Sequence, residues 1–87
     1  MDDHEFLERI KAKLERLTDT EIHLELDTED AEKLQVKLQP GAAFVTLGSN
    51  VLEYSGFARM AVEYVVASIR SGRELETLEF QMLLSRN

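Results

Sequence analysis

Residues 21–39 read EIHLELDTEDAEKLQVKLQ, and this stretch decides the fold class. In its first half, over residues 21–27, and in its second half, over residues 33–39, every second residue is apolar. These residues are Ile22, Leu24 and Leu26 in the first half and Leu34, Val36 and Leu38 in the second. Alternation with period two is typical of a strand that buries one face. Acids dominate the polar positions of the first half and lysines those of the second, so we predict an antiparallel pair joined through residues 28–32.

A turn and a third strand follow directly. Pro40-Gly41 predicts a tight turn, because proline presets φ and glycine accepts a positive φ. Residues 42–47 (AAFVTL) are β-prone with weaker alternation, which favours a central strand that is apolar on both faces. Gly48-Ser49-Asn50 then ends the strand, and Asn50 with Glu53 resembles a capping pair for the next helix.

The N-terminal segment predicts an amphipathic helix over residues 3–17. Its apolar residues recur at spacings of four, four and three, on one stripe, at Phe6, Ile10, Leu14 and Leu17. Asp2 and Glu5 offer a capping box at the start. Thr18-Asp19-Thr20 supplies the turn chemistry at the end.

A second helix is predicted over residues 51–71, with Gly72 as its C-terminal cap. It is apolar over far more of its circumference than a surface helix needs. Its charges fall on one narrow stripe, at Glu53, Arg59, Glu63 and Arg70. We therefore expect a subunit or partner interface on this helix. The candidate interface residues are Tyr54, Phe57, Met60, Val62, Tyr64 and Val66.

The last segment, residues 75–84, is compatible with a strand or a helix. Its residues are good helix formers, yet Leu78, Phe80, Met82 and Leu84 alternate with other residues. We favour the strand. The expected fold is α+β, a single domain over residues 1–87 in the order α-β-β-β-α-β. An antiparallel sheet of three to four strands would carry two helices packed on one face.

Composition excludes several function classes. The formal net charge is −7, and residues 1–40 hold most of it. A nucleic-acid binder needs a basic surface, so we expect no nucleic-acid partner. The chain has no cysteine, no secretory-signal pattern at its start and no apolar run of the roughly 20 residues that span a bilayer. We expect a cytoplasmic protein without a membrane partner.

No motif points to catalysis or to a cofactor. Glu21, His23 and Glu25 alternate on one strand face, but a solvated face explains them better than a metal site does. The acidic residues 27–32 lack the glycine and the distal glutamate of a calcium loop. Gly48-Ser49-Asn50 could bind an anion, but no Walker lysine follows. No serine lies in a Gly-x-Ser-x-Gly motif. We expect no metal and no cofactor.

The element order α-β-β-β-α resembles that of double-stranded RNA-binding domains. The second helix, however, begins Asn50-Val51-Leu52-Glu53, where those domains place basic residues. The layout is also similar to the first part of small acidic secretion chaperones, which are dimers. Element order alone does not establish function.

We therefore expect a small acidic protein-interaction domain, adaptor or chaperone-like, without catalytic activity and homodimeric through helix 51–71. Acidic residues 19–32 would steer a basic partner. The alternative is a small enzyme or ligand-binding subunit with a site formed between chains.

Overall fold

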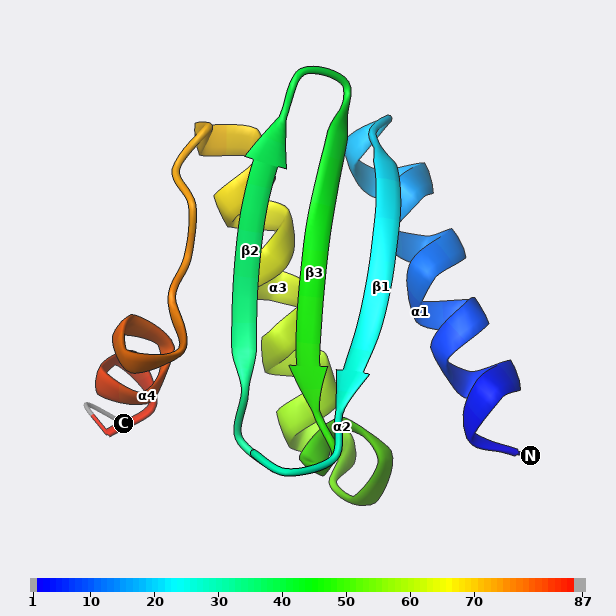
Figure 1. Ribbon diagram of the computed structural model, residues 1–87, viewed down its shortest axis with the longest axis vertical. Coiled ribbons are helices and arrows are strands. Elements are labelled where there is room, and N and C mark those ends of the chain that lie inside the picture. Colours follow the sequence, from blue (N-terminus) through cyan, green and yellow to red (C-terminus); the bar gives the residue numbers. More distant parts are fainter. Residues whose placement is uncertain (1, 86–87) are drawn as a thin grey trace.

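The computed structural model describes residues 2–85 and consists of three strands and four helices in the order α-β-β-β-α-α-α (Figure 1). The elements are α1 (Asp3–Thr18), β1 (Glu21–Asp27), β2 (Leu34–Gln39), β3 (Ala42–Gly48), α2 (Asn50–Glu53), α3 (Ser55–Ser71) and α4 (Thr77–Ser85). The predicted α+β class is confirmed. The predicted order is wrong at its end, where a helix takes the place of the fourth strand.

Helix α1 matches its prediction closely. The Asp2 carboxylate accepts a hydrogen bond of 2.8 Å from the backbone N–H of Glu5 and so caps the first turn. The helix ends at Asp19, whose φ of 50° lies in the left-handed region. Ile10 and Leu14 are buried in the core.

The sheet is mixed, with the strand order β1-β3-β2 (Figure 1). β2 and β3 are antiparallel and joined at Pro40-Gly41, where Gly41 has a φ of 77°. The predicted turn and the central place of the third strand are therefore confirmed. The predicted antiparallel pairing of β1 with β2 is wrong. Because the tight turn joins β2 directly to β3, these two strands pair with each other. β1 pairs in parallel with the other edge of β3.

The connection between β1 and β2 crosses the C-terminal end of β3. The Gly48 N–H donates to the Lys33 carbonyl at 2.7 Å, and the Asn50 N–H donates to the Ala31 carbonyl at 3.0 Å. A side chain on Gly48 would collide with the carbonyls of Asp30 and Ala31. This glycine is needed for space, since its φ is not in the left-handed range.

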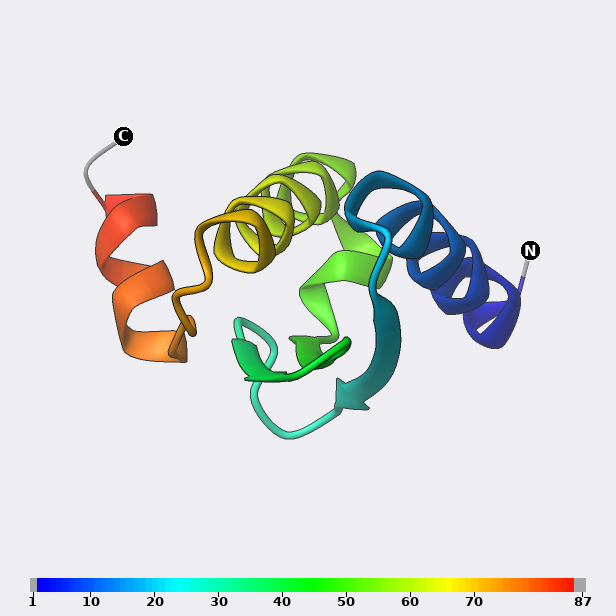
Figure 2. The same cartoon turned by 90° about the horizontal axis from the view of Figure 1, so that it is seen from above.

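Helices α1 and α3 cover one face of the sheet, as predicted, and the core lies between these two layers (Figure 2). The buried apolar residues come from all the strands and helices and include Leu14, Ile22, Leu34, Val36, Val45, Leu47, Val51, Ala61, Val65 and Phe80. In the described part of the chain, residues 2–85, no helix lies on the opposite face of the sheet, and the Phe44 ring of the central strand is exposed. The outer face of β3 thus carries an apolar residue, as predicted, but that residue is not buried.

The predicted helix 51–71 is interrupted. Tyr54 adopts an extended conformation, with φ −126° and ψ 112°, and separates α2 from α3. The break lets α2 bury Val51 while α3, running in another direction, buries Ala61 and Val65. The predicted capping pair of Asn50 and Glu53 is also wrong. Ser49 is the residue before α2, and its side chain makes no capping hydrogen bond.

The segment after α3 forms one bridge and then a helix. Gly72 caps α3 with a φ of 70°, as predicted. Leu75 pairs with Val36 on the outer edge of β2, the only residue of the predicted strand 75–84 to pair with the sheet within residues 2–85. The chain then folds into α4, since a helix buries Phe80 against α3 while Leu78 stays 68% exposed.

Candidate functional site

A groove of about 530 Å³ lies between α1 and α3 on the outer side of the helical layer. Its apolar lining comes from both helices. The groove residues are Leu17, Val62, Val66 and Ala67, with Lys13, Arg59, Glu63 and Arg70 around them. The Arg70 guanidinium donates to the Leu17 carbonyl at 3.1 Å and so connects the two helices. The groove therefore combines an apolar floor with a mainly basic rim on a chain whose net charge is −7.

One face of α3 carries four residues that we call the α3 stripe: Glu63, Val66, Ala67 and Arg70. These positions follow the spacing i, i+3, i+4 and i+7, which places them on one helix face. Glu63, Ala67 and Arg70 are exposed, and Val66 is half-buried. The stripe thus offers a small apolar centre with an acid at one end and a base at the other.

The candidate interface residues predicted from the sequence occupy different surroundings. Val62 and Val66 line the groove, while Met60 is half-buried. Tyr54 is 59% exposed at the break between α2 and α3. Phe57 and Tyr64 pack edge-to-face on Phe80, with ring centroids 5.5 Å apart in both pairs. The structure therefore brings only Val62 and Val66 together in the groove, and uses the two aromatic residues to hold α4.

Sequence reasoning missed two residues of this site. The spacing of the apolar residues places Leu17 on the stripe of α1 that faces the core, but 37% of it is exposed at the groove. Ala67 is not among the candidate interface residues predicted from the sequence, although it lines the groove. A helical wheel centred on the charges of α3 could have found Ala67, since it lies on the same helix face as Glu63 and Arg70 and between them along the helix axis. Leu17 could not be found in this way because its exposure depends on where α1 meets α3.

The uncovered face of the sheet carries the histidine considered as a metal ligand. The imidazole of His23 stacks on Phe44, with centroids 4.6 Å apart and planes inclined by 11°. Its Nε2 lies 3.3 Å from an Oε2 of Glu21. Among residues 2–85 no group of three or more histidine, aspartate or glutamate side chains is placed to hold a metal ion. The arrangement makes a flat aromatic pair on an exposed surface.

In the acidic loop after β1, the first carboxylate accepts hydrogen bonds from the backbone of the loop. The Asp27 carboxylate accepts hydrogen bonds from the N–H groups of Asp30, at 3.0 Å, and Glu29, at 2.8 Å. These bonds lower the pKa of Asp27, because they favour its charged form. Asp30 in turn accepts from the N–H of Glu32 at 3.2 Å. Both carboxylates therefore fix the turn itself, which is a sufficient reason for acids at these positions.

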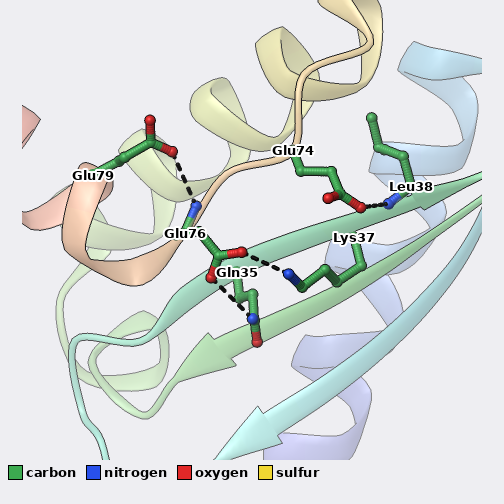
Figure 3. Close-up of polar contacts among 6 residues, drawn as sticks. All are labelled: Gln35, Lys37, Leu38, Glu74, Glu76 and Glu79. Atoms are coloured by element: carbon green, nitrogen blue, oxygen red, sulfur yellow. Dashed lines mark hydrogen bonds and ion pairs between the residues drawn. The ribbon is translucent and has the colours of Figure 1, made fainter.

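Residues 73–76 form a strap along the outer edge of β2 (Figure 3). The N–H groups of Val36 and Leu75 each donate to the other's carbonyl, at 2.8 and 3.2 Å. The Glu74 carboxylate accepts from the N–H of Leu38 at 2.9 Å. The Glu76 carboxylate accepts from Lys37 Nζ at 2.6 Å and from the side-chain amide Nε2 of Gln35 at 3.1 Å. The strap therefore closes this edge of the sheet.

The ion pair in the strap predicts a pH dependence of stability. Its hydrogen bond raises the pKa of Lys37 and lowers that of Glu76. Because the pKa of Glu76 is lowered in the folded state, its carboxylate stabilises the fold at pH values above the ordinary glutamate pKa. This stabilisation is lost as the pH falls through the folded-state pKa. Because the pKa of Lys37 is raised in the folded state, its ammonium group stabilises the fold at pH values below the ordinary lysine pKa. This stabilisation is lost as the pH rises through the folded-state pKa. We expect Glu76→Gln to unfold at lower urea than the wild type at pH 7, and we expect this difference to shrink as the pH falls through the folded-state pKa of Glu76.

Urea unfolding at several pH values checks this expectation, with Glu53→Gln on α2 as the control that removes an exposed acid elsewhere. The difference between Glu76→Gln and the wild type should be small, since both partners are exposed. A difference that stays the same from pH 7 to pH 3 would contradict the role given to the ion pair.

Comparison with protein families, with curated proteins and with solved structures found no match to this chain. Within residues 2–85, none of the helices combines the length and apolarity needed to cross a bilayer. The surfaces described above, among them the groove and the α3 stripe, are therefore the basis on which a function can be inferred.

Proposed function

We propose that this protein is a small, non-catalytic protein-interaction domain that acts as a homodimer, with the α3 stripe as the dimer contact. The observation that carries the proposal is the self-complementarity of the stripe. An acid and a base lie seven residues apart on one face, with a small apolar centre between them. A two-fold symmetric contact requires this kind of surface, because the same patch must bind its own copy.

The geometry of two antiparallel α3 helices fits this requirement. If the symmetry axis passes between Val66 and Ala67, Glu63 of one copy faces Arg70 of the other. The axis repeats that ion pair, so two charge pairs flank the apolar centre. The small Ala67 side chain lets the helices approach closely, and Leu17 and Val62 extend the apolar contact into the groove.

The dimer is expected to be weak. Interfaces of standard size bury about 1,600 Å² in total, and one helix face with a neighbouring groove offers less. Two chains of charge −7 also repel each other at long range. The local pairing of Glu63 with Arg70 offsets part of this repulsion. Association should therefore be measured over a wide concentration range.

We expect Ala67→Arg to shift the monomer–dimer equilibrium at least about tenfold toward the monomer, since it places bulk and like charges at the symmetry axis. Ala12→Arg is the matched control, because Ala12 is an exposed alanine on α1 and does not line the groove. Sedimentation equilibrium across a dilution series measures both variants. Circular dichroism checks that both stay folded.

A charge exchange tests the pairing itself. Glu63→Arg and Arg70→Glu should each weaken the dimer, and the double variant should recover association because it restores opposite charges across the axis. If the wild-type chain is a monomer at every concentration, or if the double variant is as weak as the single ones, the proposed contact is wrong.

A further inference from the structure

The two edges of the sheet differ in their protection. The outer edge of β2 is closed by the strap, through Leu75 and two carboxylates. The outer edge of β1 carries no further strand among residues 2–85 (Figure 1). An open edge presents unpaired backbone groups and is a template for another strand. The free edge of β1 is therefore the place where the sheet can be extended.

The ladder shows which backbone groups of β1 point outward. The N–H of Glu21 donates to the Gly41 carbonyl at 3.2 Å, which assigns Glu21 and every second residue after it to the ladder with β3. Ile22, Leu24 and Leu26 therefore turn their N–H and C=O groups outward. The N–H of Ile22 donates to Oε2 of Glu15 at 3.1 Å. Within residues 2–85, the N–H groups of Leu24 and Leu26 make no hydrogen bond, so the second half of the edge is available.

The side chains beside this edge indicate which residue types of a partner strand would fit there. Glu21 and Glu25 are exposed on the uncovered face of the sheet. Leu24 and Leu26 point to the helical side and are half-buried against the core. An added strand would alternate in the same way, with one set of side chains beside the acids and the other beside the leucines. Basic and apolar residues in alternation fit these two sides.

We propose that the edge of β1 binds an extended, basic segment of a partner protein as an added strand. Lysine or arginine side chains of that segment would face Glu21 and Glu25, and apolar ones would face Leu24 and Leu26. A second copy of β1 fits poorly, because it would bring the same acids into opposition. This proposal goes beyond the dimer, since no residue of the α3 stripe takes part in it.

In this mode of binding, main-chain hydrogen bonds would provide the affinity and the acidic side chains the selectivity. Main-chain hydrogen bonds to Leu24 and Leu26 would hold any extended segment of about five to seven residues, the length of an ordinary strand. The alternating acids restrict this to basic segments and raise the rate of encounter at low salt. They also prevent the edge from pairing with its own copy, which is a common use of charge on edge strands.

The test uses the full chain and a blocked heptapeptide, Lys-Val-Lys-Val-Lys-Val-Lys, as the probe. We expect saturable binding by fluorescence anisotropy at low salt, with slower hydrogen exchange at the amides of Leu24 and Leu26. The same peptide N-methylated at alternate residues should not bind, because it lacks donors for the ladder. Its glutamate counterpart should not bind either.

Variants of the chain locate the contact. Glu21→Lys with Glu25→Lys should weaken binding about tenfold or more. Glu79→Lys with Glu53→Lys is the matched control, which changes the net charge equally on α4 and α2 and should change the affinity by less than about twofold. Absence of binding would overturn the proposal. So would binding that survives N-methylation and the charge reversals, which would show attraction to an acidic surface without an added strand.

Discussion

Replacing Phe80 with alanine is expected to lower the free energy of unfolding by about 3–5 kcal/mol. Phe80 is the buried residue of α4 in the core, and the partly buried Leu84 also packs against the core. Its ring packs edge-to-face against Phe57 and Tyr64, with planes inclined by 82° and 76°. Such aromatic pairs add about 0.5–1.5 kcal/mol beyond the area they bury. For a domain whose whole stability is about 5–15 kcal/mol, this loss is large.

Thermal unfolding and urea titration measure the effect, with Leu78→Ala as the control. Leu78 lies on the same short helix but is exposed, so its truncation should change stability by less than about 0.5 kcal/mol. If both substitutions had equally small effects, α4 would not be anchored by Phe80. Amide exchange of residues 77–85 would then show a helix that opens independently of the core.

Replacing Gly48 with alanine is expected to cost about 3 kcal/mol, at the upper end of the range for forced overpacking. The new Cβ would collide with the carbonyls of Asp30 and Ala31. These obstructing atoms belong to the backbone, so no side-chain rotation can relieve the contact. The loop between β1 and β2 would have to move away and weaken its hydrogen bonds to the end of β3.

Gly56→Ala is the matched control for this substitution. Gly56 lies in α3, and an added Cβ meets no atom within 4 Å. Alanine there should raise the stability by roughly 0.4–1 kcal/mol, because it reduces the freedom of the unfolded chain. Urea unfolding of the two variants should therefore give changes of opposite sign. Equal effects would contradict the tight contact at Gly48.

The local elements of the fold were largely predictable from the sequence. The periodicity and the Asp2 cap specified α1, and Pro40-Gly41 specified the hairpin of β2 and β3. Alternation in residues 21–27 correctly gave a strand, but it defines faces and not neighbours. The opposite charges of β1 and β2 suggested direct pairing. In the sheet, His23 of β1 and Lys37 of β2 lie on opposite sides of Phe44 of β3. The polar side chains of β1 and β2 therefore share a face of the sheet, although the two strands are not neighbours.

Two predictions failed for a common reason, which is that tertiary contacts decide between local alternatives. The alternation in residues 78–84 suggested a strand, yet only Phe80 of that set is fully buried, and it reaches the core from a helix. The break at Tyr54 likewise depends on burying Val51 and Ala61 in one core. Of the candidate site, the sequence pattern indicated Val62, Val66 and the charges of α3. The groove itself depends on how α1 packs beside α3.

The position of β3 between β1 and β2 also determines how the sheet can assemble during folding. β2 and β3 are joined by a two-residue turn, so their pairing closes almost no loop. β1 pairs with β3 only after the chain has passed through β2, as the pairing of Glu21 with Ala42 shows. Formation of the β2–β3 hairpin is therefore the local step. Docking of β1, together with α1, onto this hairpin is the slower, non-local step. A newly synthesised chain would thus hold its N-terminal helix and first strand unpaired until residue 48 is available.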